Sequence, residues 1–238
     1  MPSPELLEWH ILKEIAREKD MKGLRVCVTA GPTREIIDPV RFISNNSTGK
    51  MGYAIAKEAM LRGAEVTLIS GKVNIAPVPF VNMVNIVSAK DMYYEVMKAS
   101  EYSDIIIKAA AVADYRPATV SDNKIKKKDG DMSIELTRTE DIIGTLGKNK
   151  KNNNFLCGFS METENMLENS KAKLEKKNLD MIVANNVKVK GAGFGTDTNV
   201  VTIITKNDCK ELPIMSKDDV ADEILSEILK NRKDCPSQ

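Results

Sequence analysis

The sequence predicts an α/β fold: a doubly wound, mainly parallel β-sheet with helices on both faces and a C-terminal β-hairpin extension. Short apolar runs alternate along the chain with longer segments of helical periodicity, which is typical of β-α-β units. After residue 185 the pattern changes to two strand-like runs joined by a turn at Lys206–Lys210. Because parallel strands need helical crossovers, this alternation makes the predicted fold Rossmann-like.

The N-terminal half is expected to contain helices that alternate with buried strands. Gly63 closes the helix that begins at Gly49, and Ser88 caps the following helix. The expected elements are a helix over Leu6–Lys19, a strand over Leu24–Ala30, a helix over Gly49–Arg62, a strand over Glu65–Ser70, a helix over Ser88–Ala99 and a strand over Asp104–Ala111. Residues 1–22 are expected to form an N-terminal linker helix, and residues 23–238 a single nucleotide-binding domain.

The C-terminal half continues the same alternation after a long segment without a pattern. That segment, Tyr115–Asp131, contains a basic run and predicts either a lid over a ligand or a solvated charged loop. The expected elements are a strand over Ser133–Thr137, a helix over Asp141–Leu146, a strand over Phe155–Ser160, a helix over Glu162–Lys177, a strand over Asp180–Ala184, a strand over Val200–Thr205 and a helix that opens at Ser216.

Composition excludes several classes of protein and of chemistry. The net charge is +1, which gives no reason to expect nucleic acid as a partner. No apolar run is long enough to cross a membrane and no signal-peptide pattern is seen, so a cytoplasmic protein is expected. The four cysteines form no CxxC, and His10 is the only histidine. A mechanism built on a histidine base is therefore not expected, and the ligands of any metal are unknown at this stage.

One polar stretch, Asp38–Gly52, has the composition of a strand-to-helix loop that binds an anion. Backbone N–H groups and the positive end of the helix dipole would converge there. An equally good interpretation is a surface helix capped by Ser47 or Thr48, without a ligand. The stretch does not match GxxxxGK[ST], because Ser44 and Met51 stand where a glycine and a hydroxyl are needed.

A short-chain dehydrogenase-like oxidoreductase is an alternative function. Tyr53 with Lys57, and Tyr94 with Lys98, have the YxxxK spacing of such enzymes. Both pairs fall on early helices, and no GxGxxG follows the first strand, so the nicotinamide fingerprint is missing. A second alternative is a non-catalytic nucleotide-binding subunit with the same fold.

Several linked motifs give the chain a family resemblance. They are VTAGPTRE, DPVRFISNNSTGKMG, AAVADYRP, KIKK, GFSMET, KLEKKNLD and GFGTDTN. Over roughly Gly23–Leu229 the chain closely resembles phosphopantothenate-cysteine ligase, also called phosphopantothenoylcysteine synthetase, of coenzyme A biosynthesis. The resemblance implies that a nucleotide activates the carboxylate of 4'-phosphopantothenate, as an acyl-cytidylate where CTP is used, and that cysteine then displaces the nucleotide.

The resemblance also implies cofactors, partners and site residues. Mg²⁺ would accompany CTP, which is expected ahead of ATP; a homodimer and a phosphopantothenoylcysteine decarboxylase partner are implied, and no flavin is expected in this chain. The catalytic residues carried over by position are Asn45, Arg41 and Lys124. The nucleotide-binding residues carried over are Ala110, Asp114, Lys124, Glu140, Asp141, Ile142, Ile143, Phe159, Lys173 and Lys177. The chain departs from the family pattern at Glu140, where proline is common, and at Asn46, Thr48, Ser160 and Met161.

Overall fold

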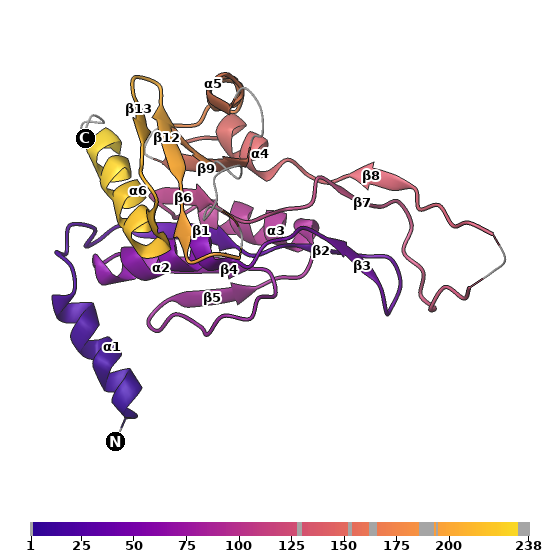
Figure 1. Ribbon diagram of the computed structural model, residues 1–238, viewed down its shortest axis with the longest axis horizontal. Coiled ribbons are helices and arrows are strands. Elements are labelled where there is room, and N and C mark those ends of the chain that lie inside the picture. The colour runs from indigo at the N-terminus through magenta and orange to yellow at the C-terminus, as the bar shows by residue number, and fades with distance from the viewer. Residues whose placement is uncertain are drawn as a thin grey trace.

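Six of the apolar runs form the parallel part of the central sheet (Figure 1). The computed structural model describes residues 2–127, 130–151, 154–161, 166–185, 193 and 195–232. The parallel strands are β1 (Arg25–Ala30), β4 (Glu65–Ser70), β5 (Asn82–Asn85), β6 (Ile105–Lys108), β9 (Phe155–Met161) and β10 (Met181–Asn185). The sheet order is β13-β12-β10-β9-β6-β1-β4-β5, so the direction of strand succession reverses between β1 and β6. Open α/β sheets bind ligands outside the carboxyl ends of the strands at such a switch point.

Two helical layers cover the sheet, as the sequence predicted. One core packs α2 (Lys50–Leu61) and α6 (Lys217–Arg232) against one face. The other packs α3 (Ala89–Ser100), α4 (Ile142–Lys148) and α5 (Met166–Lys176) against the opposite face. Strand β1 is buried on both sides: Val28 belongs to the first core and Cys27 to the second. Continuous apolar strands are what a sheet covered on both faces requires.

The C-terminal hairpin is confirmed and closes one edge of the sheet. Strand β12 (Val201–Thr205) pairs antiparallel with β10 and with β13 (Cys209–Glu211). The bond from the Thr205 N–H to the Asp208 carbonyl, 2.9 Å, closes the turn predicted at Lys206–Lys210. A two-stranded pair, β11 (Thr198–Asn199) with β14 (Met215–Ser216), follows the same antiparallel pattern.

Two small antiparallel pairs form a projection from the sheet that the sequence did not predict. They are β2 (Arg34–Ile36) with β3 (Phe42–Ser44), and β7 (Tyr115–Pro117) with β8 (Leu136–Arg138). Strands β2 and β7 contact each other, and Figure 1 shows both pairs reaching away from the sheet. We call these two pairs, with the described residues that connect their strands, the arm. The strand expected over Ser133–Thr137 is β8, displaced toward the C-terminus because it pairs with β7.

The first helix, α1 (Pro4–Ile15), lies beside the sheet domain and has no buried residue. Ser3 caps it, with its Oγ accepting the Leu6 N–H at 3.3 Å. Trp9 and Leu12 are partly buried against the core next to α2. Among the described residues no helix, this one included, has the length and apolar composition to span a membrane.

Candidate active site

A cavity of about 430 Å³ lies outside the carboxyl ends of the parallel strands. Its walls come from the loop before α2, from the segments that follow β6, β9 and β10, and from the start of α6. The lining residues are 45–52, 109–111, 114, 159–161, 185, 193, 199 and 217. This is the place that the strand order indicates for a ligand. Of the residues expected to act, Asn45, Ala110, Asp114 and Phe159 lie here.

Side chains from the first half of the chain hold the segment after β6 in place. The Thr29 Oγ1 accepts the Ala110 N–H at 3.1 Å, and the Thr33 Oγ1 accepts the Ala113 N–H at 3.0 Å. The Asn45 Nδ2 donates to the Ala111 carbonyl at 3.2 Å. The motifs VTAGPTRE and AAVADYRP therefore meet because threonine hydroxyls and one asparagine join them. These contacts fix the backbone of the cavity wall.

Glu35 of the same motif has a structural contact rather than a place in the cavity. Its side chain is buried, and its Oε1 accepts the Ala89 N–H at the start of α3, at 2.9 Å. A carboxylate at a helix N-terminus satisfies a backbone donor and is favoured by the helix dipole. Glu35 thereby ties the arm's base to the helical layer.

The N-terminus of α2 faces the cavity without a side-chain cap. The N-cap residue is Gly49, with φ +79°, and it has no side chain with which to accept a first-turn N–H. The alternative of a helix capped by Ser47 or Thr48 is therefore wrong; the Ser47 Oγ instead accepts the Gly49 N–H at 3.3 Å. Uncapped N–H groups and the helix dipole together favour an anion at this point.

Gly52 allows α2 to lie directly on the end of β1. A Cβ atom at this position would stand 2.6 Å from the Ala30 Cβ and 2.9 Å from the Thr29 carbonyl oxygen. No real Cβ tolerates such distances, so only glycine allows the helix N-terminus to reach the strand end. The final glycine of the central stretch is thus a packing requirement of the site.

Two lysines in the cavity wall hold the loop that precedes β11. The Lys50 Nζ pairs with Asp197 at 2.7 Å and donates to the Gly195 carbonyl at 3.0 Å. The Lys217 Nζ donates to the Gly193 carbonyl at 3.0 Å, and burial together with the charge of Lys50 lowers the pKa of Lys217. Sequence reasoning did not select Lys217, whose signal is only a lysine at the start of an amphipathic helix.

Asn185 was also missed, although it carries an unsatisfied group. Its Oδ1 is buried and has no hydrogen-bond partner within the described residues. It lines the cavity at the last position of β10. A buried acceptor without a donor is costly, so its presence at a cavity wall points to a ligand donor. The available signal was an asparagine directly after an apolar strand.

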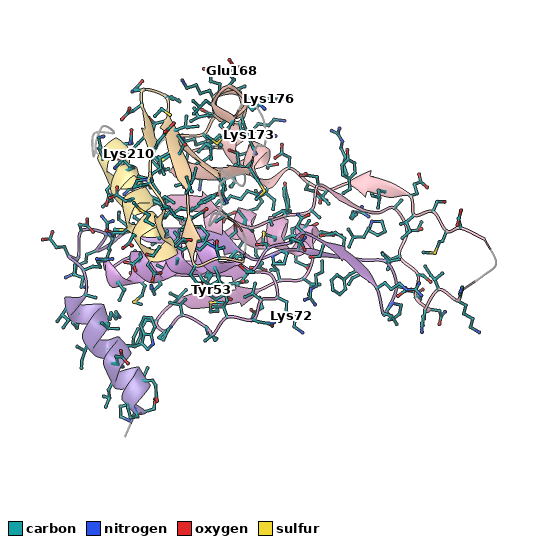
Figure 2. The ribbon with its side chains drawn as sticks, viewed as in Figure 1. Tyr53, Lys72, Glu168, Lys173, Lys176 and Lys210 are labelled. Atoms are coloured by element: carbon teal, nitrogen blue, oxygen red, sulfur yellow. The ribbon has the colours of Figure 1, made fainter. Side chains whose placement is uncertain are left out.

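Most of the remaining nucleotide-binding positions lie on α4 and α5 or directly next to their ends, and none of these residues is among those that line the cavity. Asp141 caps α4: its Oδ1 accepts the Gly144 N–H at 3.0 Å and its Oδ2 pairs with Lys177. Ile142 and Ile143 are buried in the core, so only their backbone is available to a ligand. Figure 2 shows Lys173 on α5.

Arg41 and Lys124 lie together on the arm, and neither lines the cavity. The buried carboxylate of Asp38 joins their two strand pairs. It accepts from the Arg41 Nη1 at 3.2 Å and from the Ile125 N–H at 3.1 Å, while the Arg41 Nη2 donates to the Ile125 carbonyl at 3.1 Å. Glu140 precedes α4 and is likewise outside the lining residues. Within a single chain, Arg41, Lys124 and Glu140 therefore lie outside the cavity that holds Asn45 and Asp114.

No group of three or more His, Cys, Asp or Glu side chains with the spacing of a metal site is present among the described residues. Asp114 is the carboxylate among the residues that line the cavity, and its side chain is exposed. A divalent cation here would therefore need further oxygen ligands, and a bound polyphosphate could supply them.

Comparison with known proteins identifies the family. The model described as "DNA/pantothenate metabolism flavoprotein C-terminal domain" matches residues 21–231. The chain belongs to this family. It is 52% identical over 226 residues to the coenzyme A biosynthesis bifunctional protein CoaBC of Bacillus subtilis (strain 168), covering 94% of this chain and 55% of that protein. The chain thus spans about half the length of the curated relatives it matches.

Solved structures agree with the family and the fold. A crystal structure of the C-terminal domain of a CoaBC is 44% identical with a TM-score of 0.77, and the match covers 90% of this chain and 98% of that one. A mutant of Cab2 in complex with phosphopantothenate-cysteine is 15% identical, with a TM-score of 0.72, over 97% of this chain and 96% of that one. That second likeness shows the shared fold. The family and the α/β fold predicted from the motifs are both confirmed.

Proposed function

We propose that this chain is a phosphopantothenate-cysteine ligase that works through a nucleotidyl-activated acyl intermediate. The observation that carries the proposal is the meeting of Asn45, Asp114 and the uncapped N-terminus of α2 around one cavity at the switch point. The family relationship to the C-terminal domain of CoaBC supports it, because coenzyme A biosynthesis includes this reaction. The reaction requires a site that binds a triphosphate and stabilises an oxyanion. It does not require a histidine.

In the first step the substrate carboxylate attacks the α-phosphorus of the nucleotide. A P–O bond to the acyl oxygen forms as the bond to pyrophosphate breaks. The N–H groups of the first turn of α2 bind phosphate oxygens, and they cost no reorganisation because the helix fixes them. Among the expected cations, Lys173 and Lys177 would add positive charge near Lys108, which directly precedes the cavity-lining residue Ala109.

In the second step the amine of cysteine attacks the acyl carbon and the nucleoside monophosphate leaves. The C–N bond forms as the C–O bond breaks, and the amine proton passes to solvent. The Asn45 Nδ2 is held at the Ala111 carbonyl, from which it can turn to a developing oxyanion. The unpaired Oδ1 of Asn185 supplies an acceptor for an N–H of the attacking amine. Both amides act by position and not by proton transfer.

Magnesium would be held by oxygens of the triphosphate together with Asp114. When bound it supplies charge neutralisation to the phosphates. Asp114 fits this role because it is an exposed carboxylate in the cavity wall and has no ion pair among the described residues. CTP is proposed ahead of ATP on the family resemblance.

We further propose that the enzyme is a homodimer in which the arm meets a second copy. Apolar side chains stay exposed along it: Ile36, Val40, Phe42, Val120, Met132, Ile134 and Leu136. Several exposed apolar side chains on one projecting element are typical of a protein–protein interface. The arm also carries Arg41 and Lys124 away from the cavity of their own chain, so a partner's cavity is where these cations would act. A decarboxylase as a separate or fused partner, and a cytoplasmic location, belong to the same proposal.

The experiment that tests the ligase is pyrophosphate release with 4'-phosphopantothenate, magnesium and either CTP or ATP, with and without cysteine. Release that needs phosphopantothenate is the expected result, and the better nucleotide decides base preference. Folded protein that releases none with either nucleotide refutes the ligase and favours a non-catalytic nucleotide-binding subunit.

A further inference from the structure

Lys108 lies at the carboxyl end of strand β6 and is not part of the family motifs. It is the last residue of β6, in register with Thr29 of β1 and Gly158 of β9. Ile106 and Ala110, two positions away on either side, belong to the core formed with α3, α4 and α5. Because side chains alternate along a strand, Lys108 faces that same helical layer. Gly158 has no side chain there, and Leu179 and Ile143 pack against its backbone instead.

Lys108 stands among like charges with little to neutralise it. The groups that act on it are Lys173 and Lys177 of α5, and Asp114 just after β6. Asp141 of α4 is engaged by Lys177. Within the described part of the chain, neither Lys108 nor Lys173 makes an ion pair or a side-chain hydrogen bond. Burial, with the charges of Lys173 and Lys177 and against that of Asp114, lowers the pKa of Lys108 to about 8.

An uncompensated cluster of cations beside a cavity is unfavourable unless an anion completes it. Three ammonium groups, Lys108, Lys173 and Lys177, stand against two carboxylates, Asp114 and Asp141, which leaves one net positive charge on this side of the site. A lysine ammonium donates hydrogen bonds and accepts none, so phosphate oxygens are the complementary partners. Lys108 directly precedes Ala109, Ala110 and Ala111, which line the cavity together with Asp114.

We propose that Lys108 is a further binding residue of the nucleotide site, where it binds the polyphosphate of the nucleotide together with Lys173 and Lys177. The proposal rests on the function proposed above, and it adds a property that the family motifs do not imply. Nucleotide affinity should depend on pH in the alkaline range, because only the protonated Lys108 binds phosphate. Affinity is full below the pKa of the free protein and falls as pH rises through it.

Direct binding tests this without turnover. Isothermal titration calorimetry would measure magnesium tripolyphosphate, magnesium CTP and phosphate-free cytidine, at constant excess magnesium, from pH 7.5 to 9.5. The proteins are wild type, Lys108→Met, Lys108→Arg and the control Lys176→Met, which removes an exposed ammonium of α5 (Figure 2). At pH 7.5, Lys108→Met should bind tripolyphosphate about tenfold more weakly, a change of one pKa unit in free energy. The control should stay within about twofold of wild type.

The pH series separates the charge from the shape of the side chain. The tripolyphosphate affinity of wild type should fall to that of Lys108→Met by pH 9.5. The affinity of Lys108→Arg should stay high across the range because arginine keeps its proton. Equal tripolyphosphate binding by wild type and Lys108→Met at pH 7.5 would overturn the proposal, as would a loss confined to cytidine. In both cases the ligase would stand, since wild type binds nucleotide. Wild type that binds neither CTP nor tripolyphosphate would instead refute the proposed function and this inference with it.

Discussion

The cavity and the arm carry the expected site residues in two different ways. The cavity wall is built from the ends of buried strands, and the Thr29 and Thr33 hydroxyls fix it by accepting the N–H groups of Ala110 and Ala113. The arm is built from strands of three residues and keeps apolar side chains in solvent, and the buried carboxylate of Asp38 is one of the few groups that join its two pairs. A rigid pocket and a projecting set of cations on one chain suggest that catalysis needs the arm of a second chain.

The largest effect is expected at Gly52, where α2 packs on the end of β1 with no room for a side chain. Gly52→Ala places a methyl group against Ala30 and the Thr29 carbonyl, so α2 must move off β1. We expect a loss of about 1–3 kcal/mol in the free energy of unfolding, together with loss of nucleotide binding.

The matched control is Gly130→Ala on the arm, where the new Cβ meets nothing within 4 Å. It carries only the cost of a left-handed backbone, about 1–2 kcal/mol at most, and should bind nucleotide normally. Urea unfolding and calorimetry measure both; normal nucleotide binding by Gly52→Ala would contradict the site's geometry.

Asn45→Ala should separate binding from chemistry within the cavity. The side chain is exposed, and its one hydrogen bond to another described residue is to the Ala111 carbonyl, so stability should hardly change. Loss of a donor to the oxyanion should slow the cysteine step by about 100-fold, so that the activated intermediate accumulates. Rapid quenching with labelled phosphopantothenate measures the intermediate. Cysteine coupling at the wild-type rate would remove Asn45 from its assigned role.

Mixing subunits tests whether the arm serves its own chain or the partner. Lys124→Gln and Asn45→Ala are each expected to be nearly inactive alone. If Lys124 acts on the partner's cavity, one site of each heterodimer has both residues, and an equal mixture should recover about a quarter of wild-type activity. The control follows exchange directly with differently tagged subunits, because a mixture of Lys124→Gln with wild type gives about half of wild-type activity with or without exchange. No recovery after verified exchange would place Lys124 in its own chain's site or outside catalysis.

The difference between the two regions also explains what the sequence could predict. Strands β1, β4, β6, β9 and β10 are buried on both faces, so their apolar runs are visible in the sequence. Strand β5 has partly exposed residues and the arm strands are three residues long, so neither has a readable period. For the site, the motifs located Asn45 and Asp114 at the cavity, but no local pattern shows that Lys108 of β6 lies within electrostatic reach of Lys173 of α5. The roles assigned to these residues stay predictions.

The smallest effect concerns the joint of the arm itself. Desolvation would raise the pKa of Asp38, but the N–H groups of Val40, Ile125 and Arg41, with the charge of Arg41, hold that pKa below its usual value. A carboxylate with a lowered folded pKa stabilises fully above its unfolded pKa, near 3.9, and this stabilisation is lost as pH falls through the folded value. The joint should therefore be intact at neutral pH and should weaken only below about pH 4.

Asp38→Asn should reproduce that weakening at pH 7. The amide loses the charge that pairs with Arg41 and presents one oxygen where the carboxylate presents two. We expect faster hydrogen exchange in residues 34–44 and 115–127, with exchange in β1 and β6 unchanged, because the sheet core does not depend on the arm. Asp122→Asn, an exposed change on the same arm, is the control. Mass spectrometry of deuterium uptake resolves these segments, and equal uptake by both variants would mean that Asp38 does not join the arm.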